Sequence, residues 1–172
     1  MSVRLAADDA RVIREHAREA YPHECCGFLL GRFDEDVRIV AGLARADNAR
    51  ADSPRNRYSI APKDFLRVER AARERGHEVV GFYHSHPDHP ARPSEFDREH
   101  AWPVYAYLIV SVHAGEPGEL TAWRLAPDRT GFHAEVLESP EPNPARAVDE
   151  AAPPNDARVP RPAPSSKETR WQ

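Results

Sequence analysis

The sequence feature that most constrains the fold is an apolar run, Val79 to Tyr83, that leads directly into His84-Ser85-His86-Pro87. A short run of this kind is typical of a buried strand. Side chains two residues apart on a strand project from the same face, so the two imidazoles can reach one metal ion. Asp97 can supply a third ligand from a different element. Two histidines and one carboxylate leave one open position on tetrahedral Zn²⁺, which is the pattern of a catalytic zinc site.

The segment between the histidines and Asp97 is suited to returning the chain to the metal. Pro87, Pro90 and Pro93 stiffen this loop. Ser94 and Asp97 form a Ser-x-x-Asp pattern, which is typical of a capped short helix. Such a cap would aim the Asp97 carboxylate, so the structural and the functional interpretations of the pattern are compatible.

The remaining segments predict a mixed β-sheet flanked by helices, in an α/β or α+β domain. Helices are expected where apolar residues recur at helical spacing, over residues 8–20 and between Ala61 and Gly76. Apolar, β-branched and aromatic runs predict strands over residues 25–31, 37–43, 57–60, 78–83, 105–112, 119–125 and 132–137. Residues 1–138 are therefore expected to form one compact domain.

The last part of the chain, Ser139 to Gln172, differs in composition from the rest. It holds eight of the 17 prolines, and its acidic and basic residues balance. Such a segment cannot bury enough apolar surface to offset the entropy lost on ordering. We therefore predict a Pro-rich disordered or extended tail over residues 139–172.

Charge and hydropathy exclude several partners. The net charge is −4 and no basic stripe is present, so the sequence gives no electrostatic reason to expect nucleic-acid binding. No apolar run approaches the roughly 18 residues that suggest a membrane span. The N-terminal residues lack the apolar core of a signal peptide, so a cytoplasmic location is expected.

The two cysteines, Cys25 and Cys26, are adjacent in the sequence. Neighbouring cysteines are poor partners for an ordinary disulfide, because that bond prefers a longer separation between the Cα atoms. The absence of a disulfide framework agrees with a reducing compartment. A catalytic cysteine is an alternative, but a buried cysteine more often packs as a small apolar side chain.

Amide hydrolysis also needs a general base, because a proton must pass from the attacking water to the leaving amine. Glu24 is the candidate, since this acid stands immediately before the apolar segment Cys25 to Gly31. A glutamate near a helix end is also commonly an ordinary surface residue. Position alone therefore leaves both interpretations of Glu24 open.

Taken together, these residues resemble the JAMM motif of the MPN+ metalloproteases, which are zinc isopeptidases related to deubiquitinases. The family pattern is an upstream Glu, then His-x-His, seven residues, Ser, two residues and Asp. The sequence matches it in full with Glu24, His84, His86, Ser94 and Asp97. The resemblance covers most of residues 5–125. The compact form is most similar to bacterial Mec-type members, which process ubiquitin-like sulfur-carrier proteins and in one group remove cysteine from the carrier's C-terminus.

The resemblance implies a fold, a cofactor and a role for each residue. The implied fold is the JAMM/MPN architecture, which is cytidine-deaminase-like. His84, His86 and Asp97 resemble the Zn²⁺ ligands, Glu24 the general base, and Ser94 the residue that hydrogen-bonds the oxyanion. The implied substrate is a ubiquitin-like or sulfur-carrier protein, cleaved after its C-terminal Gly-Gly. The narrow C-terminal tail of this substrate could pair with an edge strand of the enzyme by β-augmentation.

Other functions share part of this pattern. An amidohydrolase-type TIM barrel needs roughly 200 or more residues, which nearly excludes it. A zinc deaminase needs His-x-Glu and Pro-Cys-x-x-Cys, and the sequence has neither. A PHP-type phosphoesterase resembles the chain only at the His-x-His. A non-catalytic MPN scaffold that binds partner proteins usually lacks the metal ligands. The last two remain the alternatives.

Overall fold

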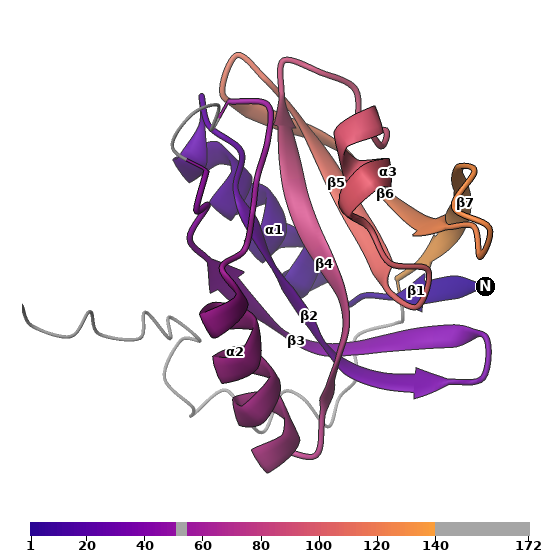
Figure 1. Cartoon of the computed structure of the whole chain (residues 1–172). Coiled ribbons are helices and arrows are strands. Elements are labelled where there is room, and N and C mark those ends of the chain that lie inside the picture. The colour runs from indigo at the N-terminus through magenta and orange to yellow at the C-terminus, as the bar shows by residue number, and fades with distance from the viewer. Residues whose placement is uncertain (51–54, 140–172) are drawn as a thin grey trace, which may run out of the picture.

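The computed structural model describes residues 1–50 and 55–139, in which one β-sheet carries helices on both faces (Figure 1). The predicted mixed sheet flanked by helices is confirmed. Its elements, in chain order, are β1 (Ser2–Arg4), α1 (Ala7–Ala20), β2 (Cys26–Asp34), β3 (Val37–Ala46), α2 (Pro62–Glu74), β4 (Glu78–Pro87), α3 (Glu95–His100), β5 (Ala106–His113), β6 (Glu116–Leu125) and β7 (Phe132–Glu138).

The sheet closes into a barrel with the strand order β1-β3-β2-β4-β5-β6-β7. Closure depends on β1, which pairs in parallel with both β3 and β7. The pair β4 and β5 is also parallel, whereas the other neighbours are antiparallel. The sequence analysis did not predict β1, because a strand of three residues carries too little apolar pattern to be recognised. Its central residue, Val3, is fully buried at the closure.

The helices divide between the two faces of the sheet. In Figure 1, α1 lies behind the strands, and α2 and α3 lie in front of them. Helix α1 buries Ile13 and Ala17 in the main core, where they pack with residues of the central strands such as Leu108. On the other face, Phe65 of α2 packs in a second cluster with Phe28. The helical periodicity seen in the sequence thus identifies the buried sides of both helices.

The connection that positions the candidate site runs from β4 through α3 to β5. Strand β4 lies between β2 and β5, so its course is fixed by hydrogen bonds on both sides. Gly81 faces Ala106 across the parallel pair, and a Cβ atom at Gly81 would lie only 2.2 Å from the Ala106 carbonyl oxygen. A glycine is therefore required where β4 approaches β5 this closely.

The prediction of a strand over residues 57–60 is wrong, because this segment is irregular and leads into α2. Its backbone groups bond to the preceding loop instead of to a strand. The Asn48 side chain donates to the Arg57 carbonyl oxygen at 3.0 Å and accepts from the Ser59 amide at 3.2 Å. The Ala49 amide donates to the Ser59 carbonyl oxygen at 2.8 Å. A side-chain amide here takes the place of a strand ladder.

The predicted end of the domain at residue 138 coincides with the end of β7. The predicted tail lies outside the described residues from 140 onward, so the division into 1–138 and 139–172 stays a prediction. Among residues 1–50 and 55–139, no helix has both the length and the apolar character that crossing a bilayer requires.

Candidate metal centre

The end of β4 brings His84 and His86 to one buried point. His84 is paired with Cys26 of β2 and with Ile109 of β5, which fixes the strand on both sides. As expected for residues two apart on a strand, the two side chains share a face, and their Nε2 atoms lie 3.0 Å apart. His84 has no exposed surface and His86 is only 7% exposed.

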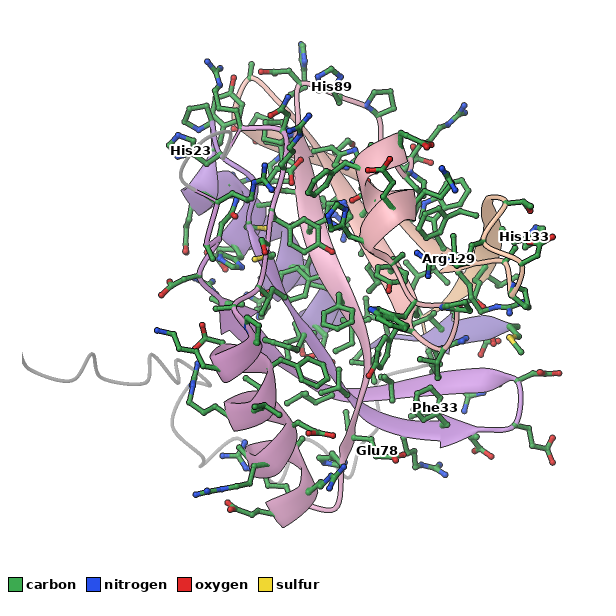
Figure 2. All side chains as sticks on the ribbon, viewed as in Figure 1. His23, Phe33, Glu78, His89, Arg129 and His133 are labelled. Carbon is green, nitrogen blue, oxygen red and sulfur yellow. The ribbon has the colours of Figure 1, made fainter. Side chains whose placement is uncertain are left out.

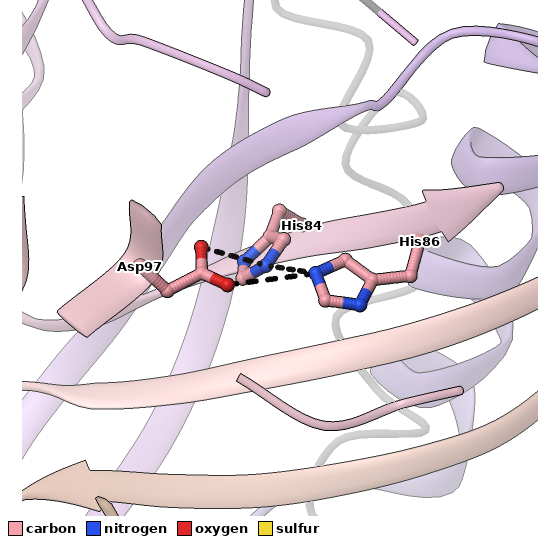
Figure 3. Close-up of side chains that lie close together, drawn as sticks. All are labelled: His84, His86 and Asp97. Atoms are coloured by element: carbon pink, nitrogen blue, oxygen red, sulfur yellow. Dashed lines mark hydrogen bonds and ion pairs between the residues drawn. The ribbon is translucent and has the colours of Figure 1, made fainter. Parts of the chain in front are cut away.

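Asp97 joins the two histidines from the first turn of α3, as Figure 3 shows. Its carboxylate oxygens lie 3.3 Å from His84 Nε2 and 3.6 Å from His86 Nε2. Ser94 is the N-cap of α3 and forms a capping box with Asp97, as the Ser-x-x-Asp pattern predicted. The Ser94 amide and hydroxyl both donate to Asp97 Oδ2, at 2.7 and 2.6 Å. The helix cap therefore holds the carboxylate toward the imidazoles.

The chemistry of these three groups fits a divalent cation. Two Zn–N bonds of about 2.0–2.1 Å at the tetrahedral angle place their nitrogens about 3.3 Å apart, close to the spacing seen. His86 Nδ1 lies 2.9 Å from the Pro90 carbonyl oxygen, so Nδ1 carries the hydrogen and Nε2 keeps its lone pair for a metal. His84 Nδ1 is buried and has no hydrogen-bond partner among the described residues. His84, His86 and Asp97 are the group whose ligand atoms lie within 4.8 Å of one another.

Burial and the neighbouring charges shift the pKa values of the three groups in different directions. Burial lowers the pKa of His84, against the opposing effect of Asp97, so the ring is held neutral. Burial lowers the pKa of His86 too, but the Asp97 carboxylate outweighs it and the net shift is upward. Burial alone would raise the pKa of Asp97, yet His84, His86 and Ser94 hold it far below its usual range. The Asp97 carboxylate is therefore ionised beside the two imidazoles, and a cation that bound there would displace the proton that the raised pKa of His86 favours.

Glu24 lies at the entrance to β2 and is 6% exposed. Two hydrogen bonds tie the adjacent residue to the motif strand: the Cys25 amide donates to Ser85 Oγ at 2.8 Å, and the Ser85 amide donates to the Cys25 carbonyl oxygen at 3.1 Å. This pairing brings the upstream acid and the histidine strand together, although 60 residues of chain separate them.

The surroundings of Glu24 make its carboxyl a proton carrier near neutral pH. Burial raises its pKa to about 8, while the charge of His86 lowers it and that of Asp97 raises it. Glu24 is thus close enough to His86 and Asp97 for their charges to act on it. A cation at those residues would lower the pKa of Glu24 toward neutrality. A general base works best when its pKa lies near the operating pH.

Two residues beside the group, Tyr58 and Asn48, were not predicted from the sequence. The Tyr58 ring stacks on the His84 ring, with 4.6 Å between the centroids. Asn48 holds the segment that carries Tyr58, and its side-chain amide also donates to the Glu24 carbonyl oxygen at 3.4 Å. No local pattern could have indicated either role, because each contact joins segments that are distant in the sequence.

A cavity of about 550 Å³ adjoins the three-residue group and includes Asp97 and Tyr58 in its wall. The rest of its lining is mostly aromatic or aliphatic and comes from α2, α3, β4, β5 and the segments before α2 and β5. Trp102 lines this cavity and is 64% exposed. An apolar cavity with a few polar groups at one end is the usual form of a ligand site.

The cysteines and the other histidines are not members of the three-residue group. Both cysteines are buried free thiols, and burial raises the pKa of Cys25 to about 12, so it is not a thiolate nucleophile. His100 bonds to the Phe96 carbonyl oxygen at 2.8 Å within α3. His23, His89 and His133 lie on the outside of the molecule (Figure 2).

The chain is similar in sequence and in fold to known proteins. A family model described as prokaryotic homologs of the JAB domain matches residues 6–126. A relative named desampylase, from Haloferax volcanii, is 43% identical over 112 residues, which are 62% of this chain and 78% of the relative. A second relative named desampylase, from Pyrococcus furiosus, is 35% identical over 105 residues, which are 60% of this chain and 67% of the relative. The solution structure of a protein from Salinibacter ruber is 48% identical and has a TM-score of 0.64, covering 83% of this chain and 94% of that one.

Proposed function

The chain belongs to the family of prokaryotic homologs of the JAB domain, and from this premise we propose that it is a zinc-dependent isopeptidase. The proposed substrate is the amide bond after the C-terminal Gly-Gly of a ubiquitin-like or sulfur-carrier protein, with cysteine as one leaving group. The two relatives named desampylase support a hydrolase of this kind. The family match favours this interpretation over a PHP-type phosphoesterase. The cytoplasm is the proposed location, supported by the free cysteines.

The observation that carries the proposal is the convergence of three potential ligand side chains from two elements. His84 and His86 of β4 meet Asp97 of α3, and Glu24 lies near enough to share their electrostatic field. Three ligands leave one position of a tetrahedral ion for substrate chemistry, whereas a structural zinc site usually has four protein ligands. We assign His84, His86 and Asp97 as the zinc ligands, Glu24 as the general base and Ser94 as the oxyanion donor.

The residues of the chain divide the chemistry as follows. A bound Zn²⁺ supplies a Lewis acid that activates water and polarises the scissile carbonyl. Glu24 accepts the proton of the attacking water and delivers it to the nitrogen of the leaving amine as the amide C–N bond breaks. Ser94 can donate to the oxyanion only when its hydroxyl turns away from Asp97, to which it donates in this structure.

The first prediction tests this proposal by mass spectrometry. Conjugates are prepared in which a ubiquitin-like protein ending in Gly-Gly is joined to cysteine, to a lysine side chain or to a peptide. The zinc-loaded protein is expected to cleave at least one of these after Gly-Gly. Glu24→Gln is expected to bind about one Zn²⁺ per chain and to lose activity by about 10²–10⁴-fold, the usual contribution of general acid–base catalysis.

A matched variant makes the result specific to Glu24. Glu74→Gln changes the same residue type on the exposed side of α2, where Glu74 forms only a loose ion pair, and should keep the wild-type rate. Zinc binding without cleavage of any conjugate would support the scaffold alternative. Failure to take up zinc at all would refute the assignment of the ligands.

A further inference from the structure

The cavity beside Asp97 is apolar along most of its wall, and one of its aromatic lining residues also contacts two arginines. Phe96, the residue before Asp97, lines this cavity, and two guanidinium groups lie over its ring. The Cζ atom of Arg57 is 5.2 Å from the ring centroid, and that of Arg50 is 5.3 Å from it. His100 stacks on the same ring with 4.1 Å between the centroids. Phe96 is therefore an aromatic platform that holds positive charge next to a residue of the cavity wall.

The chain holds Arg57 close to the metal-binding residues. The next residue, Tyr58, stacks on His84, and the platform residue Phe96 precedes Asp97. Asn48 fixes the backbone of Arg57 through the 3.0 Å hydrogen bond to its carbonyl oxygen. Two contacts therefore hold Arg57 near the proposed zinc ligands: its neighbour Tyr58 stacks on His84, and its ring partner Phe96 precedes Asp97. A substrate group bound to Arg57 would lie near the bond that is cleaved.

Within the described part of the chain, the guanidinium group of Arg57 forms no ion pair with a carboxylate. No carboxylate among residues 1–50 and 55–139 pairs with it, whereas Arg67 pairs with Asp64 and Arg98 with Glu95. The contact with the Phe96 ring does not use the N–H donors of Arg57 as hydrogen-bond partners of a carboxylate. These donors have the fork geometry that matches a carboxylate.

From these contacts we infer that Arg57 binds a carboxylate of the substrate while the apolar cavity holds the adjoining part of the same substrate. This inference rests on the proposed peptidase function and makes the enzyme selective for acidic substrates. The carboxylate can come from two sources: an acidic side chain in the tail of the carrier, or the free α-carboxylate of a leaving amino acid.

The test uses two pairs of conjugates and measures kcat/KM for each by mass spectrometry. In the first pair the carrier tail has Glu or Gln shortly before Gly-Gly. In the second pair the leaving amino acid has a free carboxylate or a carboxamide. The wild-type protein is expected to prefer the acid about tenfold in one pair, the size of one charged hydrogen-bonded contact, and that pair identifies the source.

Variants of Arg57 connect this preference to the guanidinium group. Arg57→Gln should bring the ratio of acid to neutral substrate to about one, and Arg57→Lys should keep a reduced preference, because an ammonium is a point charge without the fork. Arg70→Gln, on the exposed side of α2, is the control and should keep the wild-type ratio. A ratio near one in both pairs for the wild type, or an unchanged ratio in Arg57→Gln, would overturn the inference.

A binding measurement separates this inference from the proposed function. Glu24→Gln protein is titrated calorimetrically with the same conjugates, which it binds but cleaves slowly. A preference for the acid in this titration supports the role of Arg57 even if the wild-type protein cleaves nothing. Equal affinity for acid and neutral conjugates, together with cleavage by the wild-type protein, supports the peptidase and refutes the carboxylate site.

Discussion

The hydroxyl of Ser94 is shared between two roles that cannot be filled at the same moment. In this structure Oγ donates to Asp97 Oδ2 and accepts from the Asp97 amide at 3.2 Å, so it caps α3 and aims the carboxylate. The proposed role in catalysis requires the same hydrogen to point at the oxyanion. Because the Ser94 amide also donates to Asp97 Oδ2, the carboxylate keeps one anchor when the hydroxyl turns.

Replacing Ser94 by alanine tests both roles in one protein. We expect the unfolding free energy to fall by about 1 kcal/mol, since a helix loses its cap. Zinc affinity should fall by roughly tenfold because the ligand carboxylate loses one anchor. At saturating zinc, kcat should still fall about 10²–10³-fold, as for loss of an oxyanion donor. Urea unfolding, chelator competition and turnover measure the three effects. A wild-type kcat at saturating zinc would leave Ser94 with the positioning role alone.

At the residue scale, the sequence could predict contacts between site residues that are close together in the chain. His84 and His86 share a strand face, and Ser94 caps the turn that holds Asp97; both relations follow from spacing alone. The approach of Glu24 to this group came from the family resemblance, because the pairing of β2 with β4 joins distant segments. Arg57 and Tyr58 gave no signal, since their partners belong to other elements.

At the scale of elements, too, the helices and strands marked by a local pattern were predicted, and those that depend on distant contacts were not. Both long helices and the strand before the motif are marked by their own periodicity and by flanking Pro and Gly residues. Strand β1 is defined by its pairing with β3 and β7. The segment over residues 57–60 is hydrogen-bonded to the Asn48 side chain instead of to a strand. Local pattern therefore predicts which elements exist when they are long, while tertiary contacts decide the short ones.

The position of Asp97 depends on helix α3, which has only six residues. Its C-terminal end is held by Arg129, which lies next to α3 in Figure 2. The Arg129 guanidinium donates to the carbonyl oxygens of Ala101 at 2.9 Å and Glu99 at 3.1 Å. A helix this short is marginal alone, so these bonds complement the Ser94 cap at the other end.

We expect Arg129→Met to loosen α3 from its C-terminal end. Two charge-assisted hydrogen bonds to carbonyl oxygens are lost, which should lower the unfolding free energy by about 1–3 kcal/mol. Zinc affinity should fall roughly tenfold, because the helix no longer holds the Asp97 carboxylate in place. Arg70→Met, which replaces an exposed arginine of α2, should change neither quantity. Unchanged zinc affinity in Arg129→Met, measured by chelator competition, would show that Ser94 alone positions α3.

At the scale of the whole molecule, the two faces of the sheet have different tasks. The face covered by α2 and α3 carries the candidate site and its cavity, and the face covered by α1 carries the main core. The titratable side chain of His16 is partly buried where α1 meets β4. Its Nδ1 atom lies 2.9 Å from the hydroxyl of Tyr83, and the two rings meet edge to face. A proton on His16 would therefore act on the packing of α1 without touching the candidate metal ligands.

His16 gives the stability of the protein a dependence on pH whose sign follows from its shift. Burial, with a smaller effect of Arg45 and against that of Glu19, lowers the pKa of His16 from 6.5 to about 4. Between these values the unfolded chain binds a proton that the folded protein does not, so His16 favours unfolding progressively as the pH falls from about 6.5 to 4. The shift corresponds to a loss of up to about 3 kcal/mol. His16→Gln keeps a polar group near Tyr83 and does not titrate, so its urea unfolding free energy should decline less over this interval. Titratable groups other than His16 contribute equally to the unfolding free energies of the two proteins, so they cancel in the difference. Parallel pH profiles of the two unfolding free energies would mean that burial does not hold His16 neutral.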